Sequence, residues 1–149
     1  MEPAVTERTI ITLPDVPFRR VLPDDLGGEW AFVERGLVQT VERFAPPWTP
    51  DDVLQRLIDG KAALFVRADA FLVLEFDSEP ISERRYLNVW IMWAEPQKAY
   101  PMRAQIVAWL RAMRLATGCE WVQFSSPRDG WFGIDAGFLP VMTIWRLSE

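Results

Sequence analysis

The stretch NVWIMWAEPQKAYPMRAQIVAWLRAM, residues 88–113, decides the fold. An almost continuous apolar run leads through a short loop to apolar residues at helical spacing, which predicts a strand and then an amphipathic helix over 102–116. CEWVQFS, at 119–125, predicts another strand. Because short loops join strand, helix and strand in a right-handed crossover, we expect the strand at 86–93 to lie parallel to the strand at 120–125.

The residues before this stretch predict two helices and a β-hairpin. Apolar residues recur at helical spacing between 28 and 44, and Thr49, followed by proline and two aspartates, begins a second helix that Gly60 ends. AALFVRADAFLVLEF, at 62–76, indicates two strands around a turn, and LPVMTIWRL, at 139–147, predicts a last strand. The fold class is therefore α/β, in the broader α+β sense, with a central mixed sheet flanked by helices.

Two segments divide the chain of 149 residues. Residues 1–26 contain four prolines and short apolar runs, which favour an extended arm with one short edge strand. Residues 27–149 are expected to form a single domain, because this length suits one hydrophobic core. The arm cannot form a core alone, so we expect it to pack on a neighbouring subunit or another protein. Its expected anchors are apolar: Ile10, Ile11, Leu13 and Phe18.

The composition excludes several classes of function. Lysine and arginine number 16 against 21 acidic residues, a formal net charge of -5, so no basic surface is available to bind nucleic-acid phosphates. The chain has no histidine and one cysteine, which leaves a structural zinc ion without its usual ligands. No apolar run is long enough to span a membrane, and the first residues lack the pattern of a secretion signal. We therefore expect neither nucleic-acid nor membrane partners.

The predicted order of elements is arm, two helices, three strands, helix, strand, short helix and strand. From about residue 18 to residue 147 this order resembles the GNAT superfamily of acyl-CoA-dependent N-acyltransferases. The compact ending CEWVQFSSPRDGWFGIDAGF, at 119–138, is similar to that of small acetyltransferase-like proteins encoded among phage virion genes. The resemblance implies a GNAT-like fold, with any acyl-CoA site at the loop between the fourth strand and the following helix.

In that superfamily this loop carries Gln or Arg, two residues, Gly, one residue, then Gly or Ala, so that the backbone can approach the cofactor pyrophosphate. The in-register residues here are Gln97, Tyr100 and Met102, so both small residues are replaced by bulky ones. Pro101 also removes a backbone N–H. The resemblance therefore implies a degenerate loop and no cofactor; acetyl-CoA is the cofactor under the alternative given below.

The catalytic groups that the resemblance implies are only partly present. Many family members protonate the departing thiolate with a Tyr on the short helix after the fifth strand, but RDGWFGIDAGF, at 128–138, contains none. A base for attack by an amine would come from the strand ends, where Glu75, Asp77 and Glu95 are candidates. If the chain is an enzyme, we expect Glu75 and Glu95 to act. Cys119 has no histidine to activate it, so we expect a buried structural residue.

These features lead to one main prediction and two alternatives. The main prediction is a non-enzymatic GNAT-like structural or assembly protein, a phage virion component that contacts other virion proteins or itself. The first alternative is an acyl-CoA-dependent N-acetyltransferase with an altered cofactor loop. The second is an acidic protein that binds a host factor, which the charge of -5 and the aromatic content favour. We expect a location in the host cytoplasm or in a virion.

Overall fold

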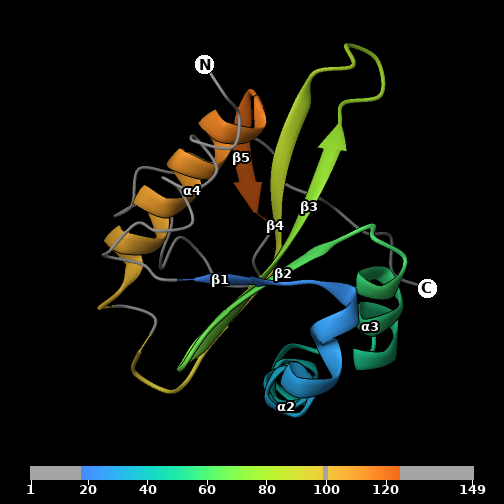
Figure 1. The fold of residues 1–149 in the computed structure, drawn as a ribbon, viewed down its shortest axis with the longest axis vertical. Helices are drawn as coiled ribbons and strands as arrows, with labels where there is room; N and C mark the ends of the chain where they lie inside the picture. The colour runs from blue at the N-terminus through green and yellow to red at the C-terminus, as the bar shows by residue number, and fades with distance from the viewer. Residues whose placement is uncertain (1–17, 99–100, 125–149) are drawn as a thin grey trace, which may run out of the picture.

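The computed structural model describes residues 18–98 and 101–124. Its elements in chain order are β1 (Arg19–Val21), the 3-10 turn η1 (Pro23–Asp25), α2 (Leu26–Phe44), α3 (Pro50–Ile58), β2 (Ala63–Arg67), β3 (Ala70–Ser78), β4 (Arg85–Ala94), α4 (Arg103–Thr117) and β5 (Trp121–Phe124). The strands form one five-stranded sheet in the order β1-β2-β3-β4-β5 (Figure 1). The predicted last strand, at 139–147, lies outside the described residues.

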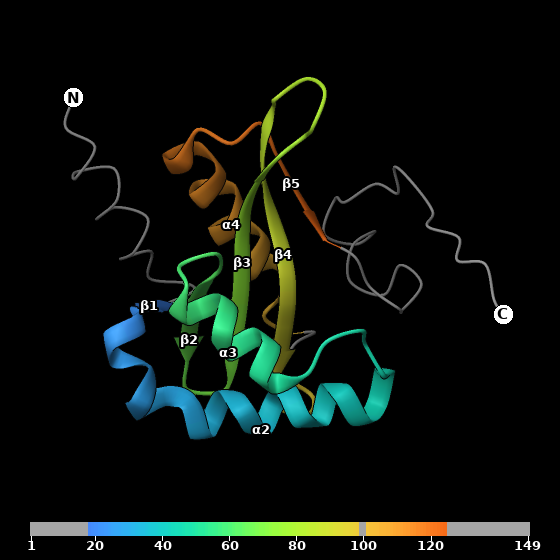
Figure 2. The ribbon, with the colours of Figure 1, turned by 90° about the vertical axis from the view of Figure 1, so that its right-hand side faces the viewer.

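The sheet is mixed, and its one parallel pair is the pair that the sequence predicts. Strands β1 to β4 are antiparallel neighbours, whereas β4 and β5 are parallel, with Tyr86 opposite Trp121 and Val89 opposite Phe124. Helix α4 connects these two strands and covers one face of the sheet, while α2 and α3 cover the other (Figure 2). The predicted α/β class and the parallel crossover are confirmed.

Each face of the sheet has its own apolar core. On the α4 face, the ring of Trp109 packs 5.0 Å from that of Phe65, measured between centroids, and Trp109 is 1% exposed. On the α2/α3 face, Phe71 and Trp93 stack with their centroids 5.5 Å apart. Side chains of β4 belong alternately to the two cores, which explains why its sequence is apolar almost throughout.

Gly36 allows α2 to approach the sheet closely. A Cβ atom at this position would lie 2.5 Å from Cε2 of Phe71 and 2.7 Å from Cδ2 of Trp93, closer than real side chains pack. A glycine in a helix interior costs free energy relative to alanine. Here that cost is offset by the contact it permits, because the helix backbone packs directly against the rings of Phe71 and Trp93.

The predicted start of α3 is confirmed in atomic detail. The Thr49 side chain accepts a hydrogen bond from the Asp52 backbone N–H at 3.2 Å, and the Asp52 carboxylate accepts one from the Thr49 N–H at 2.8 Å. This reciprocal capping box satisfies two N–H groups at the helix start. It fixes where α3 begins, and therefore which of its side chains reach the sheet.

The expected N-terminal arm is partly folded into the domain. Strand β1 pairs with β2, and the ring of Phe18 lies 5.3 Å from that of Trp109 with the residue only 1% exposed. Phe18 therefore fills the core of this chain and is not offered to a partner, because its ring is buried against Trp109 of α4. Ile10, Ile11 and Leu13 lie outside the described residues, and their partner role stays a prediction.

Candidate functional site

A β-bulge interrupts the pairing of β3 with β4. Val73 lies opposite Ile91 and Leu74 opposite Val89, so Trp90 is an extra residue on β4. Both Trp90 and Ile91 pack toward the α2/α3 core. The described pairing of β4 with β5 ends at Val89, one residue before the bulge. The bulge thus marks the point beyond which one edge of β4 has no described partner strand.

Glu75 lies on β3 directly opposite Asn88 of β4, on the α2/α3 face. Its Oε2 accepts a hydrogen bond from Nη2 of Arg56 on α3 at 2.6 Å, and its Oε1 accepts one from Nδ2 of Asn88 at 2.9 Å. The Glu75 side chain is 13% exposed. Arg56 also lies over the ring of Trp90, with Cζ 5.4 Å from the centroid. This predicted site residue therefore stands in an ordered polar cluster beside the bulge.

Glu95 follows the other end of β4 and has a different setting. Its Oε1 accepts a hydrogen bond from Nη2 of Arg35 on α2 at 2.7 Å, and its side chain is 37% exposed. Seven positions separate it from Asn88, which corresponds to roughly 20 Å along a strand. The structure therefore does not bring Glu75 and Glu95 together, and at most one of them can serve one reaction centre directly.

The loop between β4 and α4 differs from the loop that the sequence predicts. Gln97 is exposed and adopts a left-handed backbone conformation, with φ of 68°, and the Lys98 N–H bonds the Glu95 carbonyl at 3.0 Å. Met102, expected to fill the pyrophosphate position, is instead 6% exposed and belongs to the α4 core. Its side chain turns inward because α4 begins at the next residue. Tyr100 lies outside the described residues.

The start of α4 has the donor set of an anion site. No side chain caps this end and no acidic residue stands in its first turn. The N–H groups of Ala104 and Gln105 precede the first intrahelical bond, from Ile106 N to Met102 O at 3.0 Å, so they have no acceptor within the helix. Pro101 stands before this set and removes none of these donors. Donors of this kind at a helix start suit an anion such as a diphosphate.

Tyr86 and Trp121 form a flat aromatic stack beside the Glu75 cluster. Their centroids are 5.1 Å apart and their planes differ by 9°. Burial, and then the negative charges of Asp77, Glu75 and Glu79, raise the pKa of the Tyr86 phenol above its ordinary value of 10.0. Tyr86 is therefore a neutral hydrogen-bond donor at physiological pH, and Asp77 is an exposed carboxylate opposite it.

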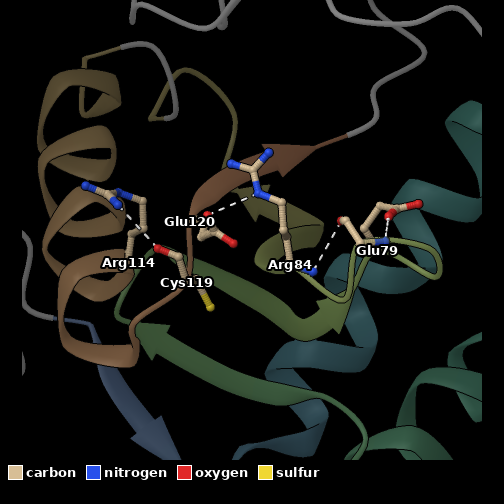
Figure 3. Close-up of polar contacts among 6 residues, drawn as sticks. Glu79, Arg84, Arg114, Cys119 and Glu120 are labelled. Atoms are coloured by element: carbon tan, nitrogen blue, oxygen red, sulfur yellow. Dashed lines mark hydrogen bonds and ion pairs between the residues drawn. The ribbon is translucent and has the colours of Figure 1, made fainter.

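Polar contacts also fix the ends of β4 and β5 nearest the β3–β4 turn (Figure 3). Nε of Arg84 donates to Oε1 of Glu120 at 3.1 Å, and Nη1 of Arg114 donates to the Cys119 carbonyl at 3.3 Å. Backbone N–H groups of the turn, that of Ser82 first, lower the pKa of Glu79. Cys119 itself is 3% exposed, which agrees with the structural role expected for it.

Two classes of site are absent from the described part of the chain. Residues 18–98 and 101–124 contain no group of histidine, cysteine, aspartate and glutamate side chains that could hold a metal ion. None of the helices within the same residues is long and apolar enough to cross a bilayer.

Comparison with known proteins identifies the fold. No protein-family model and no curated protein matches the sequence, but solved structures match. A predicted acetyltransferase with acetyl-CoA from Clostridium acetobutylicum is 14% identical, with a TM-score of 0.63 over 88% of this chain and 94% of the other. The chain has a GNAT-like N-acyltransferase fold.

Two further structures with this GNAT-like fold show a similar likeness. The ribosomal-protein-alanine N-acetyltransferase from Brucella melitensis biovar Abortus 2308 is 13% identical, with a TM-score of 0.64 over 89% of this chain and 97% of the other. An aminoglycoside acetyltransferase from an uncultured soil metagenomic sample, in complex with sisomicin, is 11% identical, with a TM-score of 0.61 over 89% and 95%. None of the three is described as a phage protein.

These comparisons correct two predictions from the sequence. The expectation of a non-enzymatic structural or virion protein is wrong, because the matching structures are acetyltransferases, and the findings favour the first alternative. The expectation of no cofactor is also wrong, since one match contains acetyl-CoA. The physical reason is at α4: the bulky residue at position 102 points into the core, so it does not occupy the pyrophosphate position that the sequence assigns to it.

Sequence reasoning missed Arg56 and Asn88, which complete the cluster around Glu75 together with Trp90. The sequence does mark Asn88. Apart from the tyrosine and tryptophan rings, it is the only polar side chain in the apolar run from Tyr86 to Ala94. The sequence does not mark Arg56, since an arginine on the polar side of a helix is ordinary. Trp131 and Phe132, where a catalytic Tyr was sought, lie outside the described residues.

Proposed function

We propose that this chain is an acyl-CoA-dependent N-acyltransferase in which Glu75 serves the acceptor amine. The observation that carries the proposal is the arrangement along β4 of the GNAT-like fold: a carboxylate beside the bulge, and an uncapped helix start after the strand. Acyl-CoA would supply an acyl group activated as a thioester. The remaining requirements, which are to bind the anion, to hold the acyl arm and to accept a proton, fall to residues of this chain.

The groups that would hold the diphosphate are the backbone N–H groups of Ala104 and Gln105, with the side chain of Gln97 at the preceding loop. Beyond Val89 the edge of β4 has no partner among the described strands, so its backbone can pair with the amide groups of the acyl-CoA arm. This edge and the start of α4 are consecutive along the chain. They fit one extended ligand in which an arm with two amides leads to a diphosphate.

Glu75 supports the proton transfer that amide formation requires. A carboxylate has about four acceptor positions. Arg56 and Asn88 fill two of them, so Glu75 can still accept a hydrogen bond from an ammonium ion or a water molecule. Glu75 first accepts a proton from the ammonium ion, directly or through water, which leaves a neutral amine whose nitrogen has a lone pair. As this nitrogen bonds to the acyl carbon and the carbon–sulfur bond breaks, the proton that the nitrogen then loses would pass to the departing thiolate. Glu95 bonds Arg35 at the far end of β4 and has no part in this step.

Calorimetric titration with acetyl-CoA, followed by assays of thiol release, tests the proposal. The amines are a polyamine, an aminoglycoside and a peptide with a free N-terminus. We expect micromolar binding, a raised melting temperature with acetyl-CoA, and release of thiol with at least one amine. Cys119 is 3% exposed, so a thiol reagent has little background in the folded protein. No binding and no thermal shift would overturn the proposal.

A pair of helix variants locates the binding site. Ala104→Glu places a carboxylate in the exposed first turn of α4, where it stabilises the helix dipole but repels a diphosphate. We expect it to weaken acetyl-CoA binding about tenfold or more while the melting temperature stays equal or rises. Ala108→Glu, one turn further along and also exposed, adds the same charge away from the helix start and should leave binding unchanged.

A further inference from the structure

The Glu75 carboxylate is held by groups from two other elements. Arg56 reaches it from α3 and Asn88 from β4, at 2.6 Å and 2.9 Å, and each bonds a different oxygen. Glu75 itself is on β3. A carboxylate that is bonded through both oxygens to two rigid elements is held in one orientation. A carboxylate with a single ion pair can still rotate.

Arg56 is itself held in place by the bulge residue. Its guanidinium lies 5.4 Å from the centroid of the Trp90 ring, and Trp48 packs edge-on against the same ring at 6.0 Å and 68°. The Arg56 side chain is 39% exposed, yet its Nε is buried and has no hydrogen-bond partner among the described residues. Leaving a buried N–H unpaired costs free energy. The position of Arg56 therefore allows Nη2 to bond Glu75 but leaves its Nε without a hydrogen-bond partner among the described residues.

We infer that Arg56 and Asn88 are positioning residues that orient the Glu75 carboxylate beside the β-bulge, so that its remaining acceptor positions face the acceptor amine. This inference rests on the proposed function. Neither residue touches the reacting atoms, and both act through Glu75. The bulge matters because it turns Trp90 to the same face as Glu75, where the ring supports the guanidinium.

A double-mutant cycle on turnover tests the inference with the full-length protein. Arg56→Met is expected to lower kcat about tenfold or more with little change in the KM for acetyl-CoA, because the carboxylate loses its orientation. Arg56→Lys keeps the charge but not the forked geometry, and should recover part of the loss. In a Glu75→Gln background, Arg56→Met should have no further effect on kcat. Asn88→Ala should behave like Arg56→Met, with a smaller loss.

Arg84→Met is the matched control. Arg84 also bonds a glutamate, Glu120, and lies over a tryptophan ring, Trp121, at 5.2 Å, but its bond is to Glu120 and not to Glu75. We expect its kcat to equal that of the wild type. Melting temperatures of all variants show which of them fold.

The outcomes separate the inference from the function on which it rests. If the wild type transfers acetyl groups but Arg56→Met lowers kcat equally with and without Glu75, Arg56 has a structural role and the inference is wrong. An equal loss in Arg84→Met would also overturn it. If the wild type neither binds acetyl-CoA nor releases thiol with any amine, the proposed function is wrong and the inference falls with it.

Discussion

Two glutamate–arginine pairs on the α2/α3 face of the sheet have the same groups in different surroundings. Arg56 bonds Glu75 and lies 5.4 Å from the Trp90 ring, while Arg35 bonds Glu95 and lies 5.5 Å from the Trp93 ring. The Glu75 side chain is 13% exposed and that of Glu95 is 37% exposed. Among the residues that the structure describes, Glu75 also accepts from a second side-chain donor, Asn88, and Glu95 does not.

An Arg–Glu ion pair alone does not tell a carboxylate that could take part in a reaction from one that only joins two elements of the fold. The Glu95 pair joins α2 to the end of β4 in a half-exposed position, where such pairs contribute about 0–1 kcal/mol. The Glu75 pair fixes a carboxylate inside the sheet next to an irregularity of β4. The two carboxylates differ in their position relative to the bulge and in the number of donors that bond them. They do not differ appreciably in their distance to arginine.

The largest expected effect is the loss of turnover in Glu75→Gln. Removing a group that accepts a proton in the reaction costs about 100-fold or more in kcat. Glu95→Gln should change kcat little, because Glu95 lies roughly 20 Å along the strand from the Glu75 cluster. Steady-state kinetics at saturating acetyl-CoA measure both. If Glu95→Gln lowered kcat more than Glu75→Gln, Glu95 and not Glu75 would be the carboxylate that matters for turnover.

The next largest effect concerns the helix that carries Arg35. Gly36→Ala should lower the free energy of unfolding by about 1–3 kcal/mol, because the new methyl group meets Phe71 and Trp93. Gly28→Ala, in the first turns of the same helix with nothing within 4 Å of the new atom, should instead raise it by up to about 1 kcal/mol. Denaturation in urea compares the two. Equal effects would show that α2 does not rest closely on Trp93.

A smaller effect is expected for the outer pair itself. Glu95→Ala should lower the free energy of unfolding by less than about 1 kcal/mol, and high salt should remove most of this difference by screening the exposed charges. Urea denaturation at low and high ionic strength measures it. A loss that is large and independent of salt would make this pair as important to the fold as the Glu75 cluster.

The smallest effect is a change in the titration of Tyr86. Its pKa is raised first by burial and then by Asp77 and Glu75, so Glu75→Gln should lower it toward 10.0, whereas Glu95→Gln should not. The folded chain holds this proton more tightly than the unfolded chain, so the stability it gives is present below pH 10.0 and is lost as the pH rises through the folded-state pKa. Tyrosinate absorbance measures it in a Tyr100→Phe background, which leaves one tyrosine.

Much of the fold follows from local sequence signals. The N-cap at Thr49 and the parallel crossover through α4 depend on residues close in the chain, and both were predicted. The Glu75 cluster could not be predicted in the same way. It joins residues 19 and 13 positions apart on three elements, and their meeting depends on the register of β3 with β4.

Side-chain direction explains the two predictions that failed most clearly at single residues. The motif register placed Met102 at the pyrophosphate, but the sequence does not show whether the residue before a helix points outward or into the core. Phe18 has the composition of a partner anchor, and only the path of the chain into β1 places it against Trp109. In both cases the prediction was right that the side chain is large and apolar. The path of the backbone around it, which the sequence does not show, determines what it contacts.

The bulge of β4 has the form of a single-residue insertion. Without Trp90, the side chains on either side would still alternate correctly, with Val89 toward α4 and Ile91 toward α2, and both strands would pair without interruption. A one-codon deletion could therefore convert this strand into a regular one, with the loss of the contacts that the Trp90 ring makes on the α2/α3 face. The support of Arg56 can thus be gained or lost in one genetic step that keeps the direction of every other side chain of β4.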